Sequence, residues 1–269
     1  MTQSDKEFIG SIPALYDRYL GPMLFEPYAT DLATRIAALA PTAVLETAAG
    51  TGIVTRRLAE VLSDAAFITA TDLNQAMIDV AAAKTVSPKI DWRACDATRL
   101  PFADGAFDCV LCQFGVMFFP SKIDAYKEAR RVLKPDGRFL FSVWDRIELS
   151  PIPETISGAI AARYPADPPD FLRRTPYGYH NVKAITTQLG EAGFRNIEFE
   201  ALTLPSHSPS PRDAAFGQCH GSPMRNEIEA RDPGGLAAAT SAAASALAAR
   251  FGEGPIESTM QAIVFTVTR

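Results

Sequence analysis

One short stretch has the residue types that bind a charged, nucleotide-like ligand. The apolar Val44 and Leu45 lead to the acidic Glu46 and then to the turn Ala48–Gly52, which contains two glycines. Glycine lets a backbone turn sharply and approach a ligand without a Cβ atom in the way. A helix predicted to begin near Ile53 adds free N–H groups and the positive end of its dipole. The stretch therefore predicts a strand, turn and helix that hold a cofactor.

A second carboxylate ends the next apolar run, Ala66–Asp72. In doubly wound nucleotide-binding folds, an acidic residue at such a strand end accepts hydrogen bonds from ribose hydroxyls. A dinucleotide and S-adenosylmethionine both carry such a ribose. Gly50 and Gly52 also approximate a dinucleotide fingerprint whose third glycine is missing. The glycine turn and Asp72 thus leave both cofactors open.

Two further strand candidates complete the pattern. Ile90–Ala94 leads to Cys95-Asp96-Ala97, and Phe107–Cys112 leads to Gln113. With these segments in order, the chain from Thr42 to Trp144 resembles the class I S-adenosylmethionine-dependent methyltransferases, in particular the small-molecule branch that includes the quinone-ring methylases. The alternatives are an NAD-dependent oxidoreductase, which would need a third glycine and a hydride-transfer proton donor, and a non-catalytic S-adenosylmethionine-binding protein.

The resemblance implies a role for each polar residue. Glu46 would hold the methionine amino group, Asp72 the ribose diol, and Asp96 the adenine amino group. Leu73 and Met77 would lie on either side of the adenine. The full predicted set of cofactor-binding residues is Tyr16, Glu46, Ala48, Gly50, Thr51, Gly52, Asp72, Leu73, Met77, Asp96, Ala97 and Gln113. Without the resemblance, Asp72 and Asp96 are equally typical of strand ends or helix caps, and Met77 of a core position.

Ala48 departs from the family pattern, because many members have glycine there. We expect its methyl group to be tolerated and to alter the exact shape of the turn.

The resemblance also implies the fold class: α/β, with a Rossmann-like, seven-stranded, mostly parallel sheet, helices on both faces, an antiparallel last strand, N-terminal helices and a helical lid insertion. We expect one methyltransferase domain over 1–269. Its expected parts are an N-terminal helical cover (1–41), a cofactor-binding core (42–145), a partial cover (146–180), and a C-terminal sheet (181–269) with a lid insertion (205–255).

Local patterns give the elements. Helices are expected at 9–20, 27–40, 54–62, 76–84, 123–132, 181–192 and 236–251, and later strands at 138–144, 197–204 and 260–268. The segment 151–176 is expected to lack regular helix because of Pro165, Pro168 and Pro169.

Composition narrows the possible partners. The chain has 269 residues, 47% of them hydrophobic, and a formal net charge of -5 without a run of Lys or Arg. Sequence-independent binding of nucleic acid relies on neutralised phosphates, so no nucleic-acid partner is expected. No apolar run reaches the roughly 18 residues of a membrane span, and Met1–Gly10 has no signal-peptide core. A cytoplasmic enzyme with a small-molecule acceptor is expected.

The cysteines raise the question of a metal site, because Cys109 and Cys112 have the spacing of many zinc ligands. Both lie in a predicted strand, where residues three apart point to opposite faces. Together with Cys95 and Cys219 they are expected to be reduced thiols, with no metal and no disulfide framework.

The acceptor side is less specific in the sequence. Phe25, Phe114, Phe118 and Arg225 are candidate substrate-binding residues, and His207 and His220 are candidate general bases because imidazole titrates near neutrality. The alternatives are aromatic packing for the phenylalanines, a structural role for each histidine, and pairing of Arg225 with Glu227 or Glu229. Nucleic-acid amine methylases usually carry an Asp/Asn-Pro-Pro-aromatic motif after the fourth strand, and this chain has Gln-Phe-Gly-Val at 113–116.

Overall fold

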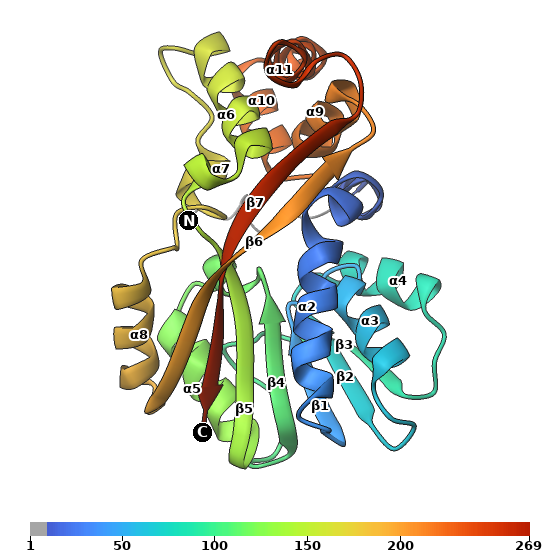
Figure 1. Cartoon of the computed structure of the whole chain (residues 1–269), viewed down its shortest axis with the longest axis vertical. Helices are drawn as coiled ribbons and strands as arrows, with labels where there is room; N and C mark the ends of the chain where they lie inside the picture. The colour runs from blue at the N-terminus through green and yellow to red at the C-terminus, as the bar shows by residue number, and fades with distance from the viewer. Residues whose placement is uncertain (1–9) are drawn as a thin grey trace. The chain divides into compact units, whose positions relative to one another are not determined.

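A computed structural model describes residues 10–269. The chain forms a seven-stranded sheet with the order β3-β2-β1-β4-β5-β7-β6 (Figure 1). The strands are β1 (Ala43–Thr47), β2 (Phe67–Asp72), β3 (Ile90–Ala94), β4 (Phe107–Gln113), β5 (Leu133–Trp144), β6 (Asn196–Ser208) and β7 (Ile256–Thr268). Strands β1 to β5 pair in parallel, and β7 is antiparallel. The predicted Rossmann-like fold is confirmed.

Helices separate most of the strands. They are α1 (Ile12–Leu15), the π-helix η2 (Tyr16–Phe25), α2 (Glu26–Ala37), α3 (Ile53–Val61), α4 (Gln75–Lys84), the 3₁₀ turns η3 (Val116–Phe118) and η4 (Ile147–Leu149), α5 (Lys122–Val132), α6 (Pro151–Arg163), α7 (Phe171–Arg174), α8 (Val182–Glu191), α9 (Pro211–His220), α10 (Met224–Arg231) and α11 (Leu236–Phe251). In Figure 1, α5 and α8 lie on one side of the sheet, and α2, α3 and α4 on the other.

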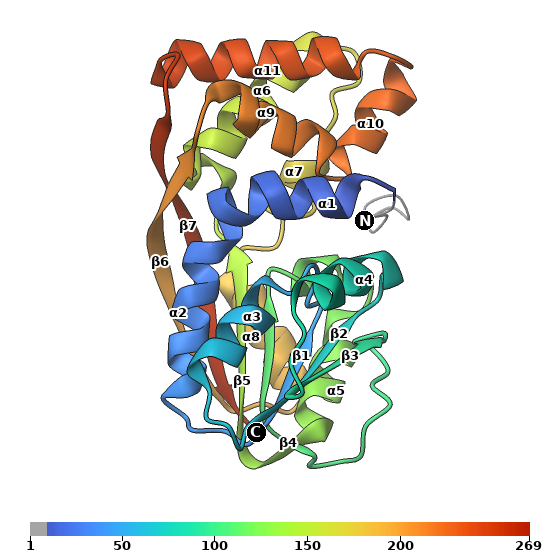
Figure 2. The ribbon, with the colours of Figure 1, turned by 90° about the vertical axis from the view of Figure 1, so that its right-hand side faces the viewer.

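The chain folds into two compact units, each built from separate stretches of sequence. Unit 1 contains the residues up to Pro27, Trp144–Tyr179 and Thr203–Gln261. Unit 2 contains Tyr28–Val143, His180–Leu202 and Ala262–Arg269. Unit 2 therefore holds the parallel strands and the glycine turn. In unit 1, α11 packs against α6 and α9 (Figure 2).

Several boundaries follow from local chemistry. Asn181 accepts a hydrogen bond from the Ala184 N–H (3.0 Å) and begins α8, and Ser210 accepts one from the Asp213 N–H (3.0 Å) and begins α9. Such side chains satisfy backbone donors that a helix start leaves without partners. Gly252, at φ 92°, ends α11, a conformation that glycine adopts without a Cβ penalty.

The N-terminal helices differ from the prediction. The sequence predicts two helices, at 9–20 and 27–40, but the chain is continuously helical from Ile12 to Ala37; residue 9 lies outside the described residues. Pro22, which lacks a backbone N–H, lies within η2, and the Glu26 N–H bonds to the Gly21 carbonyl five residues earlier. The wider π turn accommodates the proline where an α-helical ladder would break.

The expectation that 151–176 lacks regular helix is wrong for α6 in its first half and for the short α7 in its second. α6 begins at Pro151, and Pro153 is also in its first turn. Proline is tolerated there because the first N–H groups of a helix have no intrahelical acceptor. Pro165, Pro168 and Pro169 lie after the helix ends, in the connection to α7.

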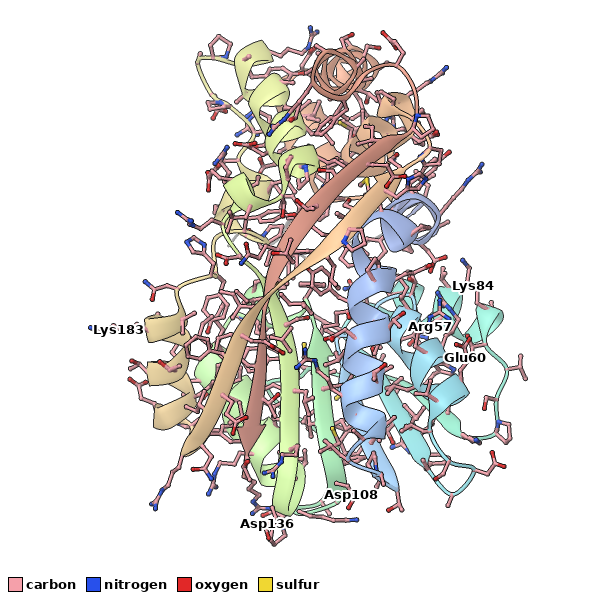
Figure 3. All side chains as sticks on the ribbon, viewed as in Figure 1. Arg57, Glu60, Lys84, Asp108, Asp136 and Lys183 are labelled. Atoms are coloured by element: carbon pink, nitrogen blue, oxygen red, sulfur yellow. The ribbon has the colours of Figure 1, made fainter. Side chains whose placement is uncertain are left out.

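The amino-terminal edge of the parallel strands is held by Asp108, which lies at the lower end of β4 in Figure 3. Its Oδ2 accepts from the N–H groups of Thr42 (2.9 Å) and Ala43 (2.8 Å), and its Oδ1 lies 2.7 Å from Lys134 Nζ. One carboxylate thus ties β1 to the start of β5.

Candidate cofactor site

The acidic residues predicted from the sequence lie at one edge of the sheet. Glu46 is the penultimate residue of β1, Asp72 is the last residue of β2, and Gln113 is the last residue of β4. β1 lies between β2 and β4 in the sheet. The chain therefore continues from β1 to strands on one side (β2 and β3) and later to strands on the other side (β4 and β5). In open α/β sheets, ligands bind beyond the carboxyl ends of the strands at such a point.

The glycine turn has one packed side and one open side. At Gly52 (φ 77°), an added Cβ would lie 2.6 Å from the Trp92 ring and 3.0 Å from the Ala81 Cβ. At Gly50 (φ 56°), an added Cβ would meet no atom of residues 10–269 within 4 Å. Ala48 also has a positive φ of 52°, in the region that glycine prefers. The turn therefore leaves the space beside Gly50 for another group.

Asp72 connects the turn to the second strand. Its carboxylate accepts hydrogen bonds from the N–H groups of Gly50 (2.9 Å) and Asn74 (2.8 Å). The side chain is buried, and burial raises the pKa of Asp72 although these hydrogen bonds oppose the shift. Each carboxylate oxygen has a second lone pair, so Asp72 has capacity to accept from ligand hydroxyls.

Glu46 is more deeply buried, with 1% of its surface exposed. The Thr55 hydroxyl donates a short hydrogen bond of 2.5 Å to Oε2. Burial raises the pKa of Glu46 to about 8; the Thr55 hydrogen bond opposes this, the charge of Asp72 adds to it, and Arg56 opposes it. A buried acid of this kind can bind a cation that compensates its charge.

A buried hydroxyl in the turn is also consistent with a polar ligand. Thr51 is 1% exposed, and its Oγ1 has no hydrogen-bond partner among the residues that the structure describes. Buried polar atoms normally have a partner, and an exception requires an explanation such as a ligand that binds there. The Thr51 carbonyl accepts from Arg56 Nη1 (2.7 Å), which fixes the backbone of the turn.

The residues predicted to contact adenine differ in exposure. Leu73 is 55% exposed, whereas Met77 is 4% exposed and packs into unit 2. Asp96 is exposed, and its Oδ1 accepts from the N–H and the hydroxyl of Thr98, both at 2.8 Å. Ala97 is half-buried. Leu73 thus offers apolar surface beside the end of β2. The Asp96 carboxylate stabilises the loop after β3 through its hydrogen bonds with Thr98.

Beyond β4, the chain turns sharply through Phe114. Gln113 is half-buried, and Phe114 has a φ of 51° and 6% exposure. The Phe114 ring meets the Tyr28 ring edge to face, with centroids 5.2 Å apart. Phe118, at the end of η3, is half-buried. Phe114 is therefore a packed residue in a strained conformation, next to the predicted contact Gln113.

Two predicted aromatic contacts belong to unit 1. The rings of Tyr16 and Phe25 stack with centroids 4.7 Å apart. They lie at opposite ends of η2, and Phe25 also packs on Trp144 at 6.2 Å. The aromatic-packing alternative thus describes Phe25 in this structure.

The two candidate bases, also in unit 1, have different surroundings. His207 Nδ1 lies 2.7 Å from Glu257 Oε1, and both side chains are largely exposed. His220 Nε2 lies 3.1 Å from Thr240 Oγ1, which itself donates to the Leu236 carbonyl. His220 Nε2 is therefore the donor of this pair, and burial followed by the charge of Arg225 lowers the pKa of His220.

Arg225 forms the local ion pair that the sequence offered as an alternative. Its Nε lies 3.0 Å from Glu229 Oε1, one helical turn away in α10. Glu227, the other candidate partner, instead accepts from Arg174 Nη2 at 2.7 Å. The pairing of Arg225 with Glu229 is confirmed.

Sequence reasoning missed the polar neighbours of Glu46. Thr55 and Arg56 lie in the first two turns of α3, and Trp92 packs on the glycine turn from β3. A hydroxyl shortly after an acidic strand end was the available signal for Thr55. Nothing in the local pattern indicated that Trp92 would lie against Gly52.

The described residues, 10–269, contain no group of three or more His, Cys, Asp or Glu side chains placed to hold a metal ion. All four cysteines are free, and Cys109 and Cys112 are fully buried in β4. Burial raises the pKa of Cys112 to about 12, so its thiol stays protonated at neutral pH. Within the same residues, no helix has the length and apolar character needed to cross a membrane.

Comparison with known proteins identifies a matching family model and several relatives of this chain. Residues 45–141 match a family model described as a methyltransferase domain. A demethylmenaquinone methyltransferase of Beutenbergia cavernae is 30% identical over 169 residues, covering 60% of this chain and 68% of that protein. The ubiquinone/menaquinone biosynthesis C-methyltransferase UbiE of Escherichia coli is 25% identical over 174 residues, covering 60% and 69%.

Solved structures share the fold. A putative methyltransferase of Bacillus halodurans has a TM-score of 0.57 at 20% identity, covering 89% of this chain and 97% of that one. The [4+2]-cyclase SpnF has a TM-score of 0.58 at 19% identity, covering 91% and 80%. Because one of these proteins is a cyclase, the shared fold does not by itself define the reaction.

Proposed function

Because the chain belongs to the class I S-adenosylmethionine-dependent methyltransferases, we propose that it transfers a methyl group to a small, apolar or aromatic metabolite. The observation that best supports a donor site is that two buried carboxylates, Glu46 and Asp72, lie next to a glycine turn with open space beside Gly50. The names of the relatives, which refer to ubiquinone and menaquinone precursors, support an aromatic acceptor.

The donor would be held by residues of unit 2. Glu46 would bind its amino group, and Asp72 would accept from its ribose hydroxyls. Asp96 would face the adenine amino group, with Leu73 and Met77 on either side of the ring. The backbone of the glycine turn and the Thr51 hydroxyl would contact its polar atoms. The remaining predicted contacts in unit 2 are Ala48, Ala97 and Gln113.

S-adenosylmethionine supplies a methyl group that its sulfonium already activates, so the protein mainly has to position the acceptor and exclude water. Aligning two reactants can remove several kcal/mol of entropic barrier. Phe114 and Phe118, which follow Gln113 in unit 2, are the proposed apolar contacts for the acceptor. An acceptor that is already nucleophilic needs no base.

For an acceptor that must be deprotonated, His220 is the better of the two candidate bases. Its lowered pKa keeps the imidazole neutral near pH 7. His207, by contrast, is paired with Glu257 at the surface. A His220→Gln variant would lose turnover with a phenolic acceptor and keep donor binding.

Calorimetric titration tests the donor site. We expect micromolar binding of S-adenosylmethionine and S-adenosylhomocysteine and no binding of NAD. Asp72→Asn should weaken both adenosyl ligands, whereas Asp79→Asn, which changes an exposed carboxylate that accepts from Gln75, should not. Tight binding of NAD would overturn the proposal in favour of an oxidoreductase.

Turnover tests the acceptor. Formation of S-adenosylhomocysteine is measured with a panel of quinols, phenols, small amines and carboxylic acids. A rate that depends on an aromatic acceptor supports the proposal. Donor binding without turnover for any acceptor would identify a non-catalytic S-adenosylmethionine-binding protein.

A further inference from the structure

The Glu46 carboxyl group has an unusual environment for an acidic residue, because it is 1% exposed. On α3, the Thr55 hydroxyl donates to its Oε2 at 2.5 Å, and Thr55 is itself fully buried. An ionised carboxylate in such a place is costly unless a cation pairs with it directly. The protonation state of Glu46 therefore depends on the charges around it.

The charged and titratable groups near Glu46 come from three elements. Asp72 on β2 is a second buried acid, whose charge disfavours ionisation of Glu46. Arg56 on α3 favours ionisation, but its Nη1 is bonded to the Thr51 carbonyl at 2.7 Å. On β4, Cys112 contributes a thiol that stays protonated at neutral pH. Two acids thus lie close together, and the guanidinium of Arg56 compensates them only in part.

We propose that Glu46 carries a proton when the donor site is empty and releases it when an ammonium group is bound, with Thr55 as the positioning residue. The proposal rests on the proposed function, because it needs a ligand with an ammonium group next to Glu46. The proton leaves the carboxyl group for solvent, and the resulting carboxylate pairs with the ammonium group. No other bond is formed or broken in this exchange.

Thr55 contributes through geometry. Its hydroxyl donates to Oε2, which fixes the orientation of the carboxyl group and leaves Oε1 to accept from the ammonium group. The hydrogen bond also stabilises the carboxylate form, so that the proton can be released near neutral pH. Thr55→Val removes the donor and keeps the shape of the side chain, whereas Thr55→Ser keeps the hydroxyl.

The sign of the pH dependence follows from the protonated resting state. The pKa of Glu46 is raised to about 8, so most of the ligand-free protein must lose a proton before the carboxylate can pair. Affinity for an ammonium-containing ligand should therefore rise by about tenfold per pH unit between about pH 6 and 7.5 and level off above pH 8. Asp72, also buried, can add to this dependence.

Two probes separate the contributions of Glu46 and Asp72. S-adenosylhomocysteine carries the ammonium group, and 5′-methylthioadenosine has the same adenosine part without it. Both place a ribose diol near Asp72, so the difference between them reports on Glu46. Calorimetry in two buffers of different ionisation enthalpy counts the protons released on binding.

We expect S-adenosylhomocysteine to release close to one proton more than 5′-methylthioadenosine at about pH 7. Thr55→Val should weaken S-adenosylhomocysteine by about tenfold at this pH and leave 5′-methylthioadenosine unchanged. It should also move the plateau of affinity to higher pH, and Thr55→Ser should restore the wild-type profile. Thr85→Val, which removes another buried hydroxyl of unit 2, is the matched control and should change neither ligand.

Equal proton release with the two probes would overturn the proposal, as would a Thr55→Val variant that binds both probes more weakly by the same factor. Failure of both probes to bind the wild-type protein would instead count against the proposed donor site. The two failures are therefore distinguishable in one set of titrations.

Discussion

Gly115 has no side chain at the point where the methyl group of Ala48 lies. A Cβ added to Gly115 would be 2.5 Å from the Ala48 Cβ and 2.7 Å from the Cys112 Sγ. Ala48 is the position where the resemblance led us to expect glycine, and it adopts a φ of 52°. The turn after β1 therefore tolerates a methyl group because the turn after β4 provides the space for it.

This relationship predicts that Gly115→Ala destabilises the protein. Forcing a methyl group into a packed site typically costs about 1–3 kcal/mol. The free energy of unfolding, measured with urea, should fall by this amount. Adding Ala48→Gly should restore part of the loss, because the contact with Cys112 remains. Gly158→Ala in α6, where an added Cβ meets no atom within 4 Å, is the control and should not destabilise.

The two glycines of the turn should respond differently to alanine. Gly52→Ala would place a methyl group 2.6 Å from the Trp92 ring, so it should lower stability and alter tryptophan fluorescence. Gly50→Ala meets no atom of the described residues within 4 Å, so its folded-state cost there is the positive φ, about 1 kcal/mol. It should nevertheless abolish binding of S-adenosylhomocysteine. Undiminished binding by Gly50→Ala would show that the open space beside Gly50 is not the ligand site.

The buried acid predicts a pH dependence of stability in the absence of ligand. The pKa of Glu46 is raised to about 8 in the folded state, well above its value of 4.5 in an unfolded chain. The folded state therefore holds a proton that the unfolded state loses. Between about pH 5 and 8, this group should lower the free energy of unfolding by up to about 1.4 kcal/mol per pH unit as pH rises.

Glu46→Gln should remove this contribution and flatten the dependence, since an amide does not titrate. Urea unfolding at several pH values measures the slope. If the free energy of unfolding of Glu46→Gln has the same slope against pH as that of the wild type, other groups cause the pH dependence. Asp72 is the nearest of them whose pKa is also raised.

Asp108 should show the opposite dependence. Burial alone would raise the pKa of Asp108, but hydrogen bonds from Lys134, Thr42 and Ala43 outweigh it and hold the pKa well below its usual range. Its contribution to stability is therefore present at neutral pH and is lost in strong acid. Asp108→Ala should cost about 2 kcal/mol at pH 7, because two backbone N–H groups lose their acceptor. Asp136→Asn, at the same end of the sheet in Figure 3, is the surface control, because asparagine tolerates the positive φ of 62° at this position.

Local patterns in the sequence determined most of the elements. The strand Ile90–Ala94 and the helix Leu236–Phe251 have the predicted bounds. Both are defined by features within their own length: apolar residues that alternate with charged ones in the strand, and an alanine-rich segment ended by Gly252 in the helix. The placement of Glu46 and Asp72 at one edge was also predictable, because parallel strands bring their carboxyl ends together.

Proline showed the limit of local reasoning. The sequence predicts two helices with a gap at 21–26, a gap that contains Pro22, and no regular helix in 151–176, yet both segments contain helix. The cost of a proline depends on whether its missing N–H had an acceptor. That depends on its position in a helix and on the helix type, which the sequence does not specify.

The sequence by itself determined which residues carry charge, where the strands end and which family the chain resembles. Only the tertiary structure decided that Thr55 bonds Glu46, that Trp92 packs on Gly52, and that Gly115 makes room for Ala48. These contacts depend on how separate segments pack, because burial and close approach are properties of the neighbours that folding supplies. For the same reason, the raised pKa of Glu46 became visible only once its side chain was seen to be buried.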